Sequence, residues 1–154
     1  MVNAPWLHVR EAVGEDVLAL HELYTVHLTK RPPAQRQDIS RWARLLQQLV
    51  DDPNYYILIG ETEYKIVSSA TLVVVPNLTN NLRPYGLIEN VVTHASHRNR
   101  GYAGEVLRRA GKIAKERDCY KVMLMTGSKL ESTLNFYEKC GFSQHEKTAF
   151  IKRF

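Results

Sequence analysis

The residues with the clearest chemical potential form one short stretch, Arg98-Asn99-Arg100-Gly101-Tyr102-Ala103-Gly104. It lies between an apolar run at 87–93 and an amphipathic segment at 102–117, which predict a strand and a helix. The first N–H groups of a helix have no partner within it, and the helix dipole adds partial positive charge there. The glycines let the main chain approach a bulky anion, and the arginines add full charges. The stretch therefore predicts a phosphate or pyrophosphate site, with a solvated helix start as the alternative interpretation.

The spacing of this stretch narrows the choice of ligand. A nucleotide-triphosphate loop requires Gly-x-x-x-x-Gly-Lys-Ser/Thr and a dinucleotide loop requires Gly-x-Gly-x-x-Gly, and neither pattern occurs in the chain. The pattern that is present, Arg98-x-x-Gly101-x-Ala103, resembles the pyrophosphate loop of the GCN5-related N-acetyltransferase (GNAT) family, Gln/Arg-x-x-Gly-x-Gly/Ala. A second segment, Leu134-Asn135-Phe136-Tyr137-Glu138-Lys139-Cys140-Gly141-Phe142, resembles that family's Phe-Tyr-x-Lys-x-Gly-Phe hallmark. It follows the loop with one predicted strand between them, as the family requires.

The elements that must position these motifs can be read from hydrophobic periodicity and turn residues. We expect a strand at 6–11, a helix from Gly14 to the segment 30–33, and a helix from Asp38 or Ser40 to Val50. Strands follow at 55–59, 64–75 and 86–93, then a helix at 102–117, a strand at 120–125, a helix at 132–140 and an extended segment at 142–154. This order matches the GNAT pattern. The order predicts one α/β domain over residues 1–154 with a mixed sheet, and the resemblance implies six to seven strands, about four helices, and strands splayed at the cofactor site.

The resemblance implies acetyl-coenzyme A as the cofactor. Its pyrophosphate would lie on the main-chain N–H groups of the loop, and its pantetheine arm would pair with the preceding strand as an added strand does. One N–H of that strand, near Val91, would polarise the thioester carbonyl. The residues assigned to the coenzyme in this way are Val91, Val92, Thr93, Arg98, Asn99, Arg100, Gly101, Tyr102, Ala103 and Gly104.

Two residues are candidates for acid–base work in a direct attack of an amine on the thioester. Tyr137 is the candidate acid for the thiolate leaving group, because the family places this phenol near the coenzyme sulfur; packing beside Phe136 and Phe142 is the alternative interpretation. Glu89 is the candidate base, because burial of a lone carboxylate in an apolar strand raises its pKa; a solvated or ion-paired glutamate with a structural role is the alternative interpretation. Strand alternation predicts that Glu89 and Val91 share one face.

Composition and charge set limits on the class of protein. With 154 residues, 44% hydrophobic and 24% charged, the chain suits a globular domain in the cytoplasm, without a signal peptide or a membrane span. The two cysteines have no zinc-site or disulfide pattern, and we expect no metal. The net charge of +5 favours acidic partners, but no nucleic-acid-binding signature occurs. Dimers are common in the GNAT family, so a homodimer is possible.

The expected acceptor is a primary amine of a small molecule. The basic segment 30–37 joins the two helices that border the acceptor groove in this family, and its charge suggests an acceptor that carries carboxylate or phosphate. Two other functions stay open. The acceptor could be a protein lysine or N-terminus, or the chain could be a non-catalytic regulatory module that binds acetyl-coenzyme A.

Overall fold

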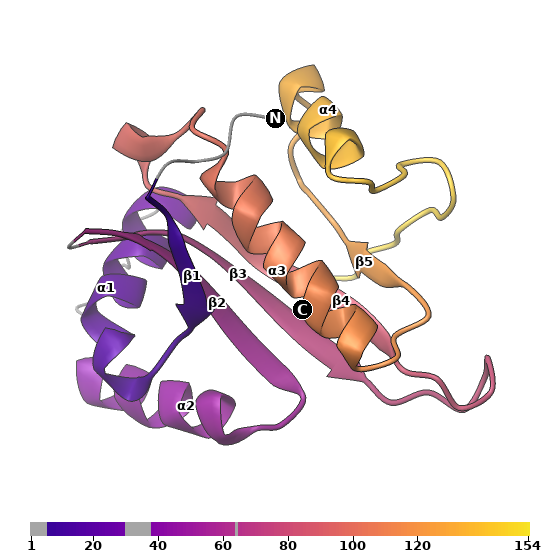
Figure 1. Cartoon of the computed structure of the whole chain (residues 1–154), viewed down its shortest axis with the longest axis horizontal. Coiled ribbons are helices and arrows are strands. Elements are labelled where there is room, and N and C mark those ends of the chain that lie inside the picture. Colours follow the sequence, from indigo (N-terminus) through magenta and orange to yellow (C-terminus); the bar gives the residue numbers. More distant parts are fainter. Residues whose placement is uncertain (1–5, 30–37, 64) are drawn as a thin grey trace.

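The computed structural model describes residues 6–29, 38–63 and 65–154, and its centre is a twisted mixed sheet (Figure 1). Within these ranges the sheet has five strands in the order β1-β2-β3-β4-β5. Strands β1 to β4 are antiparallel neighbours, and β5 is parallel to β4. The strands are β1 (His8–Glu11), β2 (Tyr55–Thr62), β3 (Lys65–Val75), β4 (Tyr85–Thr93) and β5 (Val122–Leu124).

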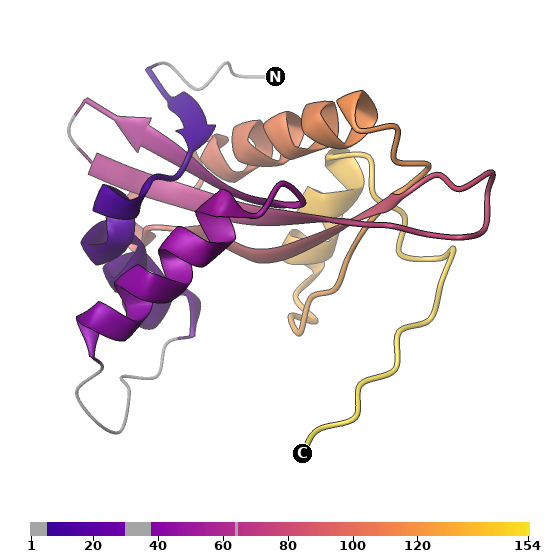
Figure 2. The same ribbon diagram turned by 90° about the horizontal axis from the view of Figure 1, so that it is seen from below.

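Helices cover both faces of the sheet. Figures 1 and 2 show α3 on one face and the pair α1 and α2 on the other. A 3₁₀ turn, η1 (Gly14–Asp16), leads into α1, which continues as one π-helical segment, η2 (Leu23–Leu28). A second 3₁₀ turn, η3 (Ala95–His97), follows β4. The α-helices are α1 (Val17–Glu22), α2 (Ile39–Asp51), α3 (Tyr102–Glu116) and α4 (Glu131–Lys139).

Alternation along the central strands builds a core on each face. Leu58 is fully buried in the cluster under α3, whereas Ile57 and Ile59 are buried against α1 and α2. Helix α3 contributes Val106, Leu107, Ala110, Ile113 and Ala114 to the first cluster, at the spacing of one helix face. Each buried Leu, Ile or Val contributes about 1.5–3 kcal/mol, so these clusters hold α3 and the sheet in register.

Two irregularities of β4 shape the region beside it. The parallel pairing with β5 ends at Ile88 and Leu124, and beyond this point the two segments diverge (Figure 1). On the other side, the register with β3 shifts between Ser69 and Thr71, and Asn90 has a φ of 53°. This is a β-bulge, in which one extra residue bends the strand. The splayed mixed sheet that the sequence predicts is therefore confirmed.

Two predictions about elements need correction. The described sheet has five strands rather than six or seven, because the segment 142–154 is extended but joins no strand. Phe150, Ile151 and Phe154 of this segment are exposed. The predicted first helix is three successive helical segments, and residues 30–37, including its predicted end, lie outside the described ranges.

Among the described helices, none combines the length and apolar character that a membrane span needs.

Candidate active site

The basic stretch forms the turn between η3 and α3. Residues Arg98–Gly101 are exposed, and Asn99 and Gly101 adopt left-handed backbone angles with φ of 60° and 81°. Gly101 caps α3, and its carbonyl accepts a hydrogen bond from the N–H of Glu105 at 3.1 Å. Within the described ranges, the N–H groups of 102–104 make no hydrogen bond to the protein. The turn therefore presents free N–H groups and the positive end of a 15-residue helix to solvent.

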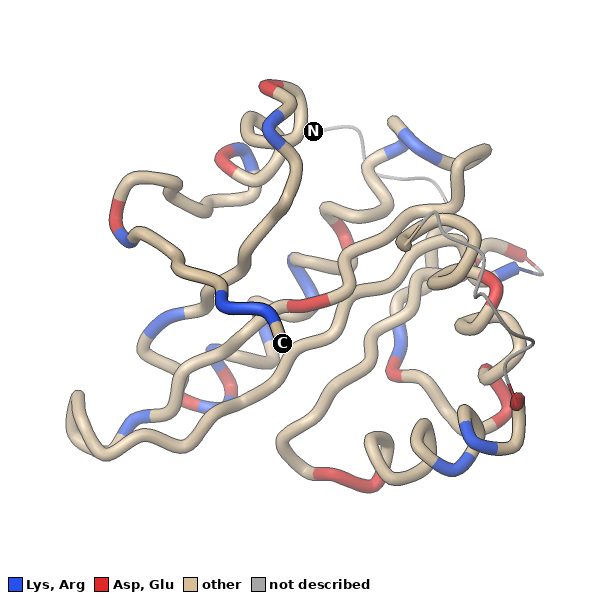
Figure 3. Tube along the Cα trace, turned by 180° about the vertical axis from the view of Figure 1, so that it is seen from behind, with Lys and Arg blue, Asp and Glu red and all other residues tan. Residues whose placement is uncertain are grey.

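Both arginines of the turn donate hydrogen bonds to carbonyl groups of the preceding chain. Nε of Arg98 donates to the carbonyl of Thr93, and Arg100 donates to the carbonyl of Ser96, each at 3.3 Å. Each guanidinium retains further N–H donors for an anion. Elsewhere, basic and acidic residues are interspersed along the described chain (Figure 3), so the distinctive feature of the turn is its backbone geometry rather than its charge alone.

Within the described residues, one edge of β4 is left without a strand partner where β5 diverges, and we call this unpaired edge the slot. After Ile88 the edge of β4 that faces β5 has no strand partner in the described part of the chain, whereas the opposite edge continues to pair with β3 through Val92 and Thr93. Ser68 strengthens the pairing of β3 with β4, because its hydroxyl donates to the carbonyl of Val92 at 3.0 Å. An unpaired strand edge is the feature to which a peptide-like chain can add. The slot leads directly to the basic turn.

Tyr137 lies on α4 and packs against the cluster under α3. That cluster also includes Val91 and Leu124, which line the point where the strands separate. The Tyr137 ring centroid lies 5.0 Å from that of Phe136 and 6.3 Å from that of Phe142. Burial, with a smaller contribution from Cys140, raises the pKa of Tyr137, so the phenol stays protonated at neutral pH. Since no buried polar side-chain atom in the described chain lacks a partner, and its hydroxyl bonds to no described residue, that hydroxyl reaches the surface.

Glu89 differs from its prediction in two ways. Its side chain is exposed, because β5 leaves β4 just before it, so the expected burial of this carboxylate is wrong. The bulge also changes the alternation: Glu89 lies opposite Thr71 and Val92 lies opposite Ser69, which places Glu89 and Val92 on the α1–α2 face. Val91 instead packs on the α3 side. Glu89 and Tyr137 therefore approach the slot from opposite faces of the sheet.

The α1–α2 face beside Glu89 carries aromatic hydroxyls. The hydroxyl of Tyr24 lies 3.3 Å from that of Ser69, and burial raises the pKa of Tyr24. Burial also raises the pKa of Tyr55, with Tyr24 and Glu89 as smaller causes. The position of the bulge was not predicted from the sequence. Asn90 is the residue that signals it, because an asparagine within an apolar strand tolerates the left-handed conformation found there.

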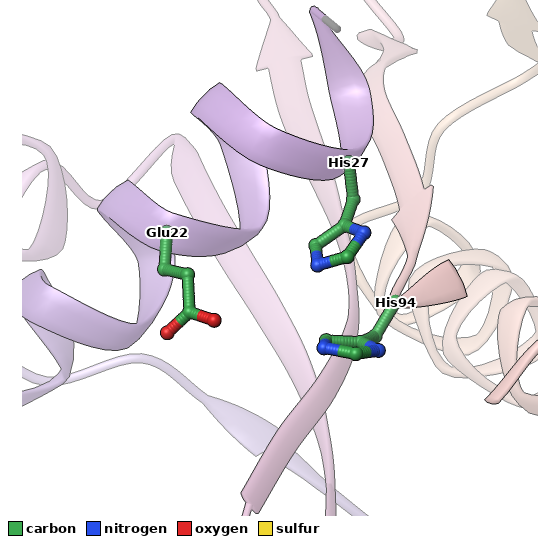
Figure 4. A group of neighbouring side chains, drawn as sticks. All are labelled: Glu22, His27 and His94. Atoms are coloured by element: carbon green, nitrogen blue, oxygen red, sulfur yellow. The ribbon is translucent and has the colours of Figure 1, made fainter. Parts of the chain in front are cut away.

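Three further side chains come together at the carboxyl end of β4 (Figure 4). One ligand atom from each of Glu22, His27 and His94 lies within 4.8 Å of the others, the arrangement of a possible metal site. The ammonium of Lys65 lies 2.9 Å from Nε2 of His94 in the same place.

A cavity of about 310 Å³ lies beside this group. It is lined by Arg10, Asp16, Ala19, Glu22, Leu23, Glu61, Lys65, Ile66 and His94. None of the predicted catalytic residues lines it, and Arg10 is bound to Asp16 and Glu61 at 2.8 and 3.1 Å.

Known proteins share both the sequence pattern and this architecture. A model of the acetyltransferase (GNAT) family matches residues 17–142. A glucosamine 6-phosphate N-acetyltransferase from Trypanosoma brucei brucei is 31% identical over 133 residues, which are 86% of this chain and 87% of that protein. A probable glucosamine 6-phosphate N-acetyltransferase 2 from Oryza sativa subsp. japonica is 37% identical over 101 residues, 63% of this chain and 58% of that protein. The solved structure of a putative acetyltransferase from Agrobacterium tumefaciens str. C58 has a TM-score of 0.85 and 37% identity, covering 95% of this chain and 99% of that one.

The family match and the trypanosomal relative each extend over most of the chain, well beyond the two motifs. The structural match covers the sheet, the splay and the turn before α3 together. These findings confirm the resemblance seen in the sequence. The chain therefore belongs to the acetyltransferase (GNAT) family.

Proposed function

We propose that this acetyltransferase moves the acetyl group of acetyl-coenzyme A to the primary amine of a small phosphorylated molecule. The observation that carries the proposal is the unpaired edge of β4 leading into the N–H groups at the start of α3. This combination fits a peptide-like arm that ends in a diphosphate. The main chain of Val91, Val92 and Thr93 would pair with the arm, and the turn from Arg98 to Gly104 would hold the diphosphate.

The proposed chemistry needs no nucleophile from the protein. The bound coenzyme supplies an acetyl thioester, and Glu89 accepts a proton from the acceptor's ammonium group, directly or through water. The neutral nitrogen attacks the thioester carbonyl, so that a carbon–nitrogen bond forms and the carbon–sulfur bond breaks. Tyr137 gives its proton to the departing sulfur, and the second proton of the acetylated nitrogen returns to the Tyr137 phenolate through water.

The names of the relatives and the basic charge of the segment 30–37 support a phosphorylated amino sugar as the acceptor. The trypanosomal and rice relatives are glucosamine 6-phosphate N-acetyltransferases by name. The segment 30–37, outside the described ranges, carries Lys30, Arg31 and Arg36 between the two helices of the α1–α2 face, and an anionic group would complement it. Glucosamine 6-phosphate has both the amine and the phosphate, and is therefore the acceptor to test first.

The experiment compares acceptors at equal concentration. The chain is incubated with acetyl-coenzyme A and either glucosamine 6-phosphate, glucosamine or a lysine-containing peptide, and thiol release is followed. We expect rapid release with glucosamine 6-phosphate and much slower release with glucosamine. Release with the peptide alone would contradict the small-molecule acceptor. Thermal stabilisation by the coenzyme with no release for any amine would instead support a regulatory module.

A further inference from the structure

Two imidazoles cap the turn that precedes the coenzyme loop. The N–H of Ala95 donates to Nδ1 of His27 at 3.2 Å, and the N–H of Ser96 donates to Nδ1 of His94 at 3.2 Å. These N–H groups begin η3, so no carbonyl of that short helical turn can accept from them. His94 is the residue directly before η3, but His27 reaches it from η2, 68 residues earlier in the chain.

This contact is linked to the proposed diphosphate site by a short series of bonds. The η3 turn ends at His97, and the loop begins at the next residue, Arg98. Arg100 in the loop donates to the carbonyl of Ser96 within η3. A displacement of Ala95 and Ser96 would therefore move an anchor of the loop and the direction from which its N–H groups approach an anion.

The hydrogen bonds favour this capping role over a metal site for the same residues. Because Nδ1 of His27 accepts from Ala95, the neutral ring carries its proton on Nε2, the nitrogen nearer Glu22 and His94 (Figure 4). A metal on Nε2 would require the proton on Nδ1, where it would oppose the Ala95 N–H. The ammonium of Lys65, 2.9 Å from His94, also repels a second cation.

We propose that His27 is a positioning residue for coenzyme binding, whose imidazole accepts the Ala95 N–H and so fixes η3 and thereby the loop from Arg98 to Gly104. The inference depends on the proposed function, because it assumes that this loop binds the coenzyme diphosphate. Removal of the acceptor atom at Nδ1 therefore weakens coenzyme affinity.

The second cap has an electrostatic reason to stay an acceptor. Burial, with smaller contributions from His27, Lys65 and His97, lowers the pKa of His94, which favours the neutral ring that can accept the Ser96 N–H.

The test uses calorimetric titration with coenzyme A on a matched pair of variants. His27→Asn keeps an acceptor near the position of Nδ1, whereas His27→Leu removes it. We expect Leu to raise the Kd roughly fivefold and Asn to leave it near the wild-type value. The acceptor KM stays unchanged in both variants. His145→Leu, which alters an exposed histidine on the C-terminal segment, is the control and leaves the Kd unchanged.

Equal Kd values for Leu and the wild type, or equal losses for Leu and Asn, would overturn the inference. So would a Zn²⁺-dependent rise in wild-type Tm that His27→Asn abolishes, since this indicates a metal site. Failure of the wild type itself to bind coenzyme A would contradict the proposed function instead.

Discussion

A substitution at Tyr137 tests a role in the reaction separately from a role in coenzyme binding. Its hydroxyl reaches the surface, whereas its ring packs in the cluster under α3. Tyr137→Phe keeps the ring and removes only the proton donor. We expect kcat to fall by about 10²-fold or more, the range of general acid catalysis, with little change in coenzyme Kd. Steady-state kinetics and calorimetry measure the two quantities. An unchanged kcat would leave Tyr137 with a packing role only.

For Glu89 we predict an effect on the acidic side of the pH profile. The proposed base must be ionised to receive the proton of the amine, so kcat/KM falls as pH decreases, and Glu89→Gln removes that limb and lowers the plateau about 10²-fold. Glu116→Gln, at the end of α3, serves as the control. A profile that keeps its acidic limb in Glu89→Gln would show that another group, or the amine itself, titrates there.

His94 links protonation to stability. Its pKa is lowered in the folded chain, first by burial and then by His27, Lys65 and His97, so the unfolded chain binds a proton more readily. Stability is therefore complete above the unfolded pKa of about 6.5 and is lost as pH falls through the lower folded value. We expect Tm to fall between about pH 7 and pH 5 in the wild type. The fall should be smaller in His94→Asn; identical falls would contradict this origin.

At the scale of elements, the bulge in β4 can be tested directly. Asn90 occupies a left-handed conformation with φ of 53°, which is strained for a β-branched residue by about 1–2 kcal/mol. Asn90→Val should therefore destabilise the chain by about that amount and weaken coenzyme binding, because the adjacent Val91 lines the slot. Asn90→Gly should have little effect on either quantity. Chemical denaturation measures stability, and equal effects of the two substitutions would rule out backbone strain as the cause.

The elements with strong local signals were predictable from the sequence, and those set by distant partners were not. Helix α3 begins at Tyr102 as expected, because the glycines and the apolar periodicity lie within the segment itself. The pairing register of β4 depends on β3, so the bulge and the exposure of Glu89 could not be derived from the strand alone. The segment 142–154 has an extended pattern but finds no strand partner in the described structure, because β5 pairs over only three residues.

At the scale of the whole molecule, two cores on opposite faces hold the sheet while β4 and β5 separate at one end. This arrangement gives the slot access from both faces, with Tyr137 on the α3 side and Glu89 on the α1–α2 side. Tyr137 was chosen as a candidate from its motif, and Glu89 from its place in the apolar strand before the loop. Their placement on opposite faces was not predictable, because it follows from the bulge and from the docking of α4.

The central claim is that the turn at the start of α3 binds a diphosphate. The most direct measurement is a calorimetric titration of the wild-type chain with coenzyme A and, separately, with pantetheine, which lacks the diphosphate and the nucleotide. Dephospho-coenzyme A, which keeps the diphosphate but lacks the 3′-phosphate, is the third ligand. We predict similar binding of coenzyme A and dephospho-coenzyme A and at least tenfold weaker binding of pantetheine. Equal affinities for pantetheine and coenzyme A would contradict the account.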